Sequence, residues 1–70
     1  MKPAELGNRL KEERLRRGLT QAELARLVNV TRKTINTVEN QVFIPSTLLA
    51  LKLARELRVP VEQLFFLTEK

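Results

Sequence analysis

A cluster of polar side chains recurs on one side of a short segment near the middle of the chain. If residues 32–40 form a helix, its period of 3.6 residues places Ile35 and Val38 together on the opposite side. The polar side consists of Arg32, Lys33, Asn36, Thr37 and Asn40. Arginine and lysine can bond guanine O6 and N7, asparagine can grip adenine, and threonine offers a hydroxyl and a methyl to thymine. A solvated face would more often contain glutamate, and the one acid here, Glu39, falls off this side. The pattern favours base reading in a DNA groove, with a plain solvated face as the alternative.

Residue 21 is a second place where an anion could be bound. Gln21 would open a helix, so its side chain and the exposed backbone N–H groups lie at the positive end of the helix dipole, where a phosphate fits. Arg16 and Arg17 precede the joint at Gly18 and could clamp the same strand. Two arginines also suit the negative end of the preceding helix, so both interpretations of Arg17 stay open.

Other kinds of chemistry lack their usual residues. The 70 residues include no cysteine and no histidine, which removes thiolate and imidazole ligands and nucleophiles. We find no nucleophile with a base, no glycine loop for phosphates and no carboxylate cluster, so we expect no enzyme, no metal and no cofactor. RNA binding is disfavoured because no exposed aromatic platform accompanies the charge. No membrane span or apolar leader is recognisable, and we expect a cytoplasmic protein.

The charge is unevenly distributed. The net charge is +5, and residues 9–33 carry eight basic against three acidic groups, so the remainder is neutral. One face of a single small domain is therefore expected to meet a polyanion while the other serves structure or self-association. A solubilising basic surface is the alternative.

The helix start and stop signals along the chain predict an all-α fold of five helices. The predicted helices span about 4–17, 21–28, 32–40, 46–57 and 61–66, and residues 67–70 form a tail. Gly18 supplies a left-handed stop, Thr20 with Glu23 forms a capping box, and Thr31 caps the third helix. The inward positions are Leu6 and Leu10, then Leu24, Ala25 and Val28, then Ile35 and Val38, then Ala50, Leu53, Ala54 and Leu57, and finally Leu64 and Phe65.

From Leu10 to Phe65 the chain resembles the helix-turn-helix of the lambda repressor and Cro type, also called the XRE family. The resemblance rests on Arg14, Gly18-Leu19-Thr20-Gln21, Leu24-Ala25, Val28, Val30-Thr31, Ile35, Glu39-Asn40, Pro45-Ser46, Leu53-Ala54, Leu57 and Leu64-Phe65. It implies a compact five-helix bundle in which residues 32–40 form the recognition helix. Many fixed positions at fixed spacing make it specific.

The resemblance also implies roles for single residues. Gln21 would contact a phosphate and buttress the first recognition residue, and Asn36 would contact either a base or the backbone. Arg32, Lys33 and Thr37 would read bases, and Asn40 would contact the backbone. Together with the observations above, this makes Arg32, Lys33, Asn36 and Thr37 the candidate base readers and Arg17, Gln21, Thr31 and Asn40 the candidate phosphate contacts. Arg14 and Glu39 would form a partly buried ion pair, which assigns Arg14 a structural role.

Two departures from the family pattern follow the third helix. Gln41 stands where many members have glycine, so we expect the helix to run longer. The next residues, Val42, Phe43 and Ile44, are apolar for a surface loop. We expect them to fold back onto the core, the alternative being that a partner covers them.

Further apolar residues point away from the predicted core. Leu48 and Leu51 face outward beside Arg55, and with Phe66 and Leu67 they make a candidate dimer interface. A symmetric dimer would place two recognition helices about 34 Å apart on one face of a palindromic operator in double-stranded DNA. Alternatively, the last helix and the tail cover Leu48 and Leu51 within one chain.

We therefore expect a homodimeric, sequence-specific transcriptional regulator. Repression is favoured because the sequence leaves no segment for a further domain. The alternative is a protein-interaction module of the same fold, antitoxin-like or coactivator-like, in which the third helix need not read bases.

Overall fold

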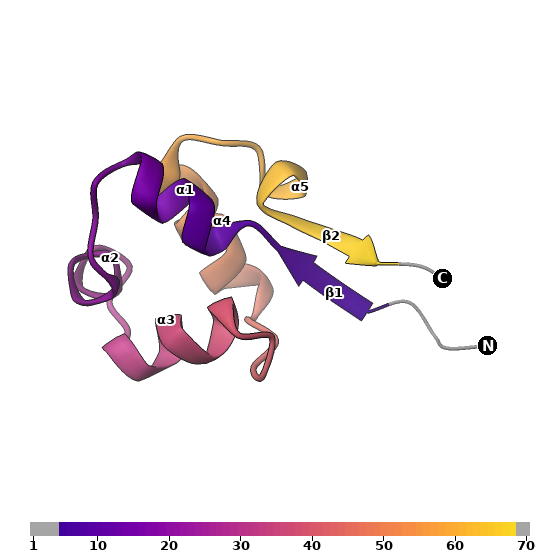
Figure 1. The fold of residues 1–70 in the computed structure, drawn as a ribbon, viewed down its shortest axis with the longest axis horizontal. Coiled ribbons are helices and arrows are strands. Elements are labelled where there is room, and N and C mark those ends of the chain that lie inside the picture. The colour runs from indigo at the N-terminus through magenta and orange to yellow at the C-terminus, as the bar shows by residue number, and fades with distance from the viewer. Residues whose placement is uncertain (1–4, 69–70) are drawn as a thin grey trace.

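The computed structural model describes residues 5–68, which form five helices and a two-stranded antiparallel sheet at one end of the bundle (Figure 1). The elements are β1 (Glu5–Asn8), α1 (Leu10–Arg16), α2 (Gln21–Leu27), α3 (Arg32–Glu39), α4 (Thr47–Leu57), α5 (Val61–Leu64) and β2 (Phe65–Thr68). The predicted five-helix bundle is confirmed. The expectation of a purely helical fold is wrong, because both ends of the described chain are strands.

The first correction concerns the segment before α1. The helix predicted from about residue 4 begins at Leu10, residues 5–8 form β1, and Ala4 lies outside the described residues. Gly7 pairs with Phe66, and a Cβ on Gly7 would lie 2.6 Å from Phe66 Cε1. The phenyl ring therefore occupies the space that any other residue at position 7 would fill. Leu6 still packs partly against the core, but from a strand.

The second correction concerns the other end. The helix predicted over 61–66 stops at Leu64, and β2 replaces its last turn and part of the expected tail. Phe65 has extended backbone angles (φ −125°, ψ 138°), yet it remains buried beside Leu64, as predicted for this pair. Two adjacent phenylalanines favour a strand once a partner strand is available.

The core lies where the helices converge. Its buried side chains are Leu10, Leu24, Ala25, Val28, Ile35, Val38, Leu49, Leu53, Ala54, Leu57, Leu64 and Phe65. Nearly all of the predicted inward positions belong to this set. Ala50 is only half-buried, and its neighbour Leu49 is buried without having been predicted.

The helix starts and the joint between α2 and α3 follow local sequence signals. The Thr20 hydroxyl accepts from the Glu23 N–H at 3.0 Å, and the Glu23 carboxylate accepts from the Thr20 N–H at 2.8 Å, which completes the capping box. The Thr31 hydroxyl caps α3 by accepting from the Thr34 N–H. Gly18 (φ 71°) and Asn29 (φ 63°) take the left-handed conformation that turns the chain after α1 and α2.

The loop after α3 differs from both expectations. The prediction of a longer helix is wrong, because α3 ends at Glu39 and Gln41 itself adopts the left-handed conformation (φ 62°). The expected folding back onto the core is also wrong, since Val42, Phe43 and Ile44 are 76%, 47% and 71% exposed. The loop offers apolar side chains to solvent.

Among residues 5–68, no group of three or more acidic residues is arranged to hold a metal ion. None of the helices formed by these residues has the length and apolar character needed to cross a membrane.

Candidate nucleic-acid interface

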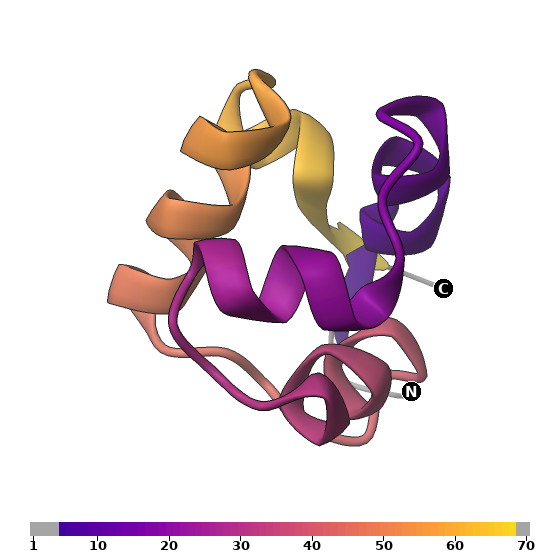
Figure 2. The same cartoon turned by 90° about the vertical axis from the view of Figure 1, so that its left-hand side faces the viewer.

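Helix α3 presents one side to solvent, and helix α2 supports it from the other side. α3 lies beside α2 (Figure 2). The buried residues are Ile35 and Val38 in α3 and Leu24 and Ala25 in α2. The inner side of α3 is thus fixed to the core, and its outer side is free to meet a ligand. The division of residues 32–40 into a buried apolar side and an outer polar side, expected from the helical period, is therefore present in the structure.

The outer side of α3 is exposed and cationic at its start. Arg32, Lys33, Asn36 and Asn40 are exposed, and Thr37 is half-buried. Within residues 5–68 the ion pairs are Arg14–Glu39 and Arg16–Glu13, so neither Arg32 nor Lys33 is paired there. Both charges remain available to an anionic or acceptor-rich partner.

Arg14 and Glu39 join α1 to the end of α3. Arg14 Nε donates to Glu39 Oε2 at 2.7 Å and its Nη2 donates to Oε1 at 3.3 Å, while its Nη1 donates to the carbonyl of Leu19 at 2.8 Å. The two side chains are only 9% and 4% exposed. Arg14 is thus committed to the interior, and Glu39 carries a compensated charge under the outer side of α3.

Gln21 is the first residue of α2, and its side chain reaches two residues of α3. Its Nε2 donates to Glu39 Oε1 at 3.1 Å and to Asn36 Oδ1 at 3.2 Å. Asn40 Nδ2 donates to the same Asn36 oxygen at 3.3 Å. The resemblance implied that Gln21 supports the first recognition residue. In the structure the residue of the outer side that Gln21 contacts is Asn36, one turn after the start of α3.

The threonines of this region use their hydroxyls within the protein. Thr37 Oγ1 donates to the Thr34 carbonyl at 3.0 Å, which leaves its methyl group and oxygen lone pairs for a partner. The Thr31 hydroxyl caps α3 and also lies 3.0 Å from Thr34 Oγ1. The backbone at the start of α3 is thereby fixed.

Arg17 lies apart from the other candidate phosphate contacts. It is exposed in the joint between α1 and α2. It lines a hollow of about 390 Å³ together with Arg55 and Arg58. Its contact with a phosphate stays a prediction.

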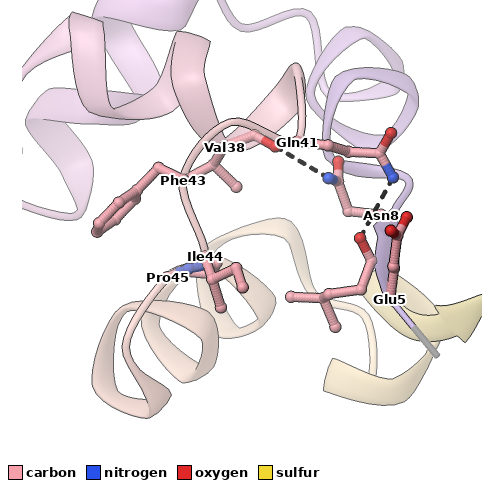
Figure 3. A pocket seen from close by; sticks show the side chains of 8 residues that line it. Glu5, Asn8, Val38, Gln41, Phe43, Ile44 and Pro45 are labelled. Atoms are coloured by element: carbon pink, nitrogen blue, oxygen red, sulfur yellow. Dashed lines mark hydrogen bonds between the residues drawn. The ribbon is translucent and has the colours of Figure 1, made fainter. Parts of the chain in front are cut away.

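Asn8 was not singled out from the sequence, and Gln41 was noted only as a departure from the family pattern, although both attach the sheet to α3 and the loop after it (Figure 3). Asn8 Nδ2 donates to the Val38 carbonyl at 3.0 Å, and its Oδ1 accepts from the Leu10 N–H at 3.0 Å. Gln41 Nε2 donates to the Leu6 carbonyl at 3.2 Å. The N-cap of α1 is Arg9, and the bond from the Leu10 N–H back to Asn8 is an Asx turn, a local asparagine signal that could have indicated a break in the chain before α1.

The candidate dimer residues divide between two places. Leu48 and Leu51 are 64% and 52% exposed on α4, so the idea that helix α5 and the tail cover them is wrong. Phe66 and Leu67 are successive strand residues and point to opposite faces of the sheet. Leu67 is 67% exposed, whereas the centroid of the Phe66 ring lies 4.5 Å from the guanidinium carbon of Arg9. Phe66 therefore already has partners within its own chain.

One carboxylate near the start of α2 has a shifted pKa. The Thr20 backbone N–H holds the pKa of Glu23 below its ordinary value of 4.5, with further help from the Thr20 hydroxyl and Arg26 against slight desolvation. Glu23 stays ionised at neutral pH and serves the cap.

This arrangement, with a capped α2, a left-handed joint and an exposed α3, also defines a known protein family. A model of the family described as Helix-turn-helix matches residues 10–64. The chain belongs to the helix-turn-helix family of DNA-binding regulators. Its expected XRE-type resemblance is confirmed.

Relatives of similar length lie in bacteria and archaea. The chain is 40% identical over 63 residues to the uncharacterized HTH-type transcriptional regulator YgzD of Bacillus subtilis, covering 90% of this chain and 96% of the relative. It is 46% identical over 61 residues to an uncharacterized HTH-type transcriptional regulator of Methanothermobacter thermautotrophicus, with coverage of 86% and 88%.

Solved structures of helix-turn-helix proteins show the same arrangement. The restriction-modification controller protein C.AhdI from Aeromonas hydrophila superposes with a TM-score of 0.74 at 34% identity, covering 79% of this chain and 83% of that one. The hypothetical transcription factor NHTF from Neisseria gives a TM-score of 0.72 at 28% identity, with coverage of 77% and 62%.

Proposed function

We propose that this helix-turn-helix protein binds a palindromic operator in double-stranded DNA as a homodimer, with α3 of each copy in the major groove, and represses transcription. The bases are read by Arg32, Lys33, Asn36 and Thr37. The backbone phosphates are contacted by Arg17, Gln21, Thr31 and Asn40. Repression follows because a protein bound over a promoter excludes polymerase without any further contact.

The observation that carries this proposal is the outer side of α3. It carries two cations that have no ion-pair partner among residues 5–68, and beside them amide and hydroxyl groups. The opposite side of the same helix is buried. A rigid helix with such groups matches the width of the major groove and its hydrogen-bonding edges. The net charge of +5 adds attraction to phosphates.

The dimer rests on the exposed leucines of α4. One copy of α3 reads one half-site, and a second copy related by a twofold axis reads the other about 34 Å away. Leu48 and Leu51 form the centre of the contact, with Leu67 as an additional candidate and Phe66 held in its own chain. Exposed apolar side chains that are neighbours on one helix mark an interface.

The test is selection of bound sequences from a randomised duplex pool at near-physiological salt, where charge-only binding is weak. We expect an enriched palindrome and, by sedimentation, twice the mass of one chain. Enrichment of no sequence, together with binding that salt abolishes, would refute the proposal.

The apolar loop after α3 supports a second candidate function. Val42 and Ile44 are more than two thirds exposed, which suits a protein partner, as in an antitoxin-like or coactivator-like module. In that case Val42→Ser with Ile44→Ser abolishes partner binding, and Arg32→Ala with Lys33→Ala leaves it intact. For the first candidate function, Arg32→Ala with Lys33→Ala should abolish binding to operator DNA, and Val42→Ser with Ile44→Ser should leave it intact.

A further inference from the structure

A chain of hydrogen bonds beneath α3 starts at a group whose polarity is fixed. The Glu39 carboxylate can only accept hydrogen bonds, and Arg14 holds it from Nε at 2.7 Å and from Nη2 at 3.3 Å. Its side chain is 4% exposed, so it cannot turn away toward solvent. Any group placed against Oε1 must therefore be a donor.

That requirement fixes the orientation of Gln21. Its Nε2 lies 3.1 Å from Glu39 Oε1, and the opposite orientation would set a carbonyl oxygen against the carboxylate. The second hydrogen of the same amide group is directed to Asn36 Oδ1 at 3.2 Å. Both side-chain donors of Gln21 are thus used within the protein, which leaves its backbone N–H, at the first position of α2, for the proposed phosphate contact.

The same requirement passes on to Asn36. Its Oδ1 accepts from Gln21 at 3.2 Å and from Asn40 Nδ2 at 3.3 Å, which occupies both lone pairs. Asn36 is exposed on the outer side of α3. It therefore presents to a partner an NH₂ group with two donors, and no acceptor.

This polarity changes which base Asn36 can recognise. The bidentate grip of asparagine on adenine needs a donor for N7 and an acceptor for the N6 amine. Guanine presents two acceptors, N7 and O6, and thymine presents O4, whereas adenine and cytosine each present an amine. Two donors that face each other would leave both unsatisfied in a dry interface.

We infer that Asn36 is a specificity-determining residue that selects a keto base, guanine or thymine, and that Gln21 acts as its positioning residue by blocking the acceptor. The inference rests on the proposed function. Gln21 thereby determines specificity without having to touch a base.

The experiment compares selected DNA motifs of four proteins: the wild type, Asn36→Ala, Gln21→Leu and Gln63→Leu. Asn36→Ala identifies the position that Asn36 reads, because only there is the preference lost. We expect guanine or thymine at that position in the wild-type motif. Gln21→Leu has a similar size without donors, which frees Asn36 Oδ1 to turn outward. We expect it to lower the preference for a keto base over adenine at that position by about tenfold.

Gln63→Leu is the matched control, because Gln63 is an exposed glutamine on α5 and the same substitution there should leave the motif unchanged. Thermal unfolding establishes that each variant is folded. Should Gln21→Leu not fold, the identity of the base at the Asn36 position in the wild type decides alone.

Each contrary result has a distinct meaning. Adenine or cytosine at the Asn36 position, an unchanged preference in folded Gln21→Leu, or no position altered by Asn36→Ala would overturn this inference while leaving DNA binding intact. Absence of any enriched motif for the wild type would instead overturn the proposed function, and this inference with it.

Discussion

The exposed residues of α3 depend for their orientation on the buried polar side chains beneath them. Glu39 would repel DNA if it were unpaired, but Arg14 compensates it, and together they set the orientation of Gln21. A network of this kind is stable only when every member is satisfied, and no buried side-chain polar atom in the described part of the chain lacks a hydrogen-bond partner. The ion pair is therefore both a structural and an orienting element.

Removing one partner of this pair should be costly. In Glu39→Gln the guanidinium of Arg14 stays buried without its counter-charge, and we expect a loss of about 3 to 5 kcal/mol in the free energy of unfolding. Urea unfolding measures it. A double-mutant cycle measures the coupling. The double variant Arg14→Met with Glu39→Leu should lose less unfolding free energy than Arg14→Met and Glu39→Leu lose in sum when each is made alone. Additive losses below about 1 kcal/mol would show that the pair is not coupled.

The prediction of these residues from the sequence was uneven for a physical reason. Arg14 and Glu39 were paired through the family resemblance, and the structure places them together. The contact of Gln21 with Asn36 was not predicted, because side-chain partners across two helices depend on helix angle and rotamer, which the helical period does not fix.

At the scale of elements, helices with a local signal were located and strands were not. The cap at Thr20 and the stops at Gly18 and Asn29 act within a few residues, so the sequence predicts α2 and α3 closely. β1 and β2 are four residues each and pair across almost the whole chain, from Glu5 to Thr68. Neither segment is long enough to show a period, and an isolated pair of strands gains its stability from the core beside it.

The sheet should depend on the lack of a side chain at position 7. In Gly7→Ala the new methyl group would collide with the Phe66 ring at 2.6 Å and with Thr68 Cγ2 at 2.8 Å. We expect a loss of about 1 to 3 kcal/mol, measured by thermal unfolding. In a Phe66→Ala background, the same change should cost less, since the ring is absent. Equal stability of Gly7→Ala and the wild type would show that the ring moves freely.

The capping box of α2 makes a prediction about pH. Because the pKa of Glu23 is lower in the folded protein than its ordinary 4.5, its contribution to stability is complete above that value. The contribution is lost as pH falls through the lowered pKa. Carbon-13 NMR titration of the Glu23 carboxyl should give a midpoint below 4.5. Thr20→Ala should raise that midpoint only in part, because the backbone N–H remains. A midpoint at or above the ordinary value in the wild type would contradict the cap.

At the scale of the whole molecule, self-association determines whether one or two half-sites are bound. We expect Leu48→Glu with Leu51→Glu to give a folded monomer, because two carboxylates cannot be buried in the contact. Sedimentation measures the mass and circular dichroism the helix content. Leu15→Glu with Leu27→Glu is the matched control, since these leucines are 56% and 52% exposed elsewhere. A dimer that survives the first pair, or loss of helix content, would refute the assignment.

The sequence predicts the surface of this molecule less well than its core. It indicated that Leu48 and Leu51 face away from the core, and they do. It did not indicate that Phe66 packs on Gly7 and Arg9, because that contact exists only in the sheet.

The central claim is that α3 reads bases while other cations hold the backbone, and binding to single-base variants of the selected operator tests it most directly. Lys33→Ala should lose discrimination at one position by about 1 to 3 kcal/mol. Arg17→Ala should weaken binding to all sequences alike and reduce the salt dependence by about one phosphate contact. If both variants weaken every sequence equally and neither changes base choice, α3 does not read the operator.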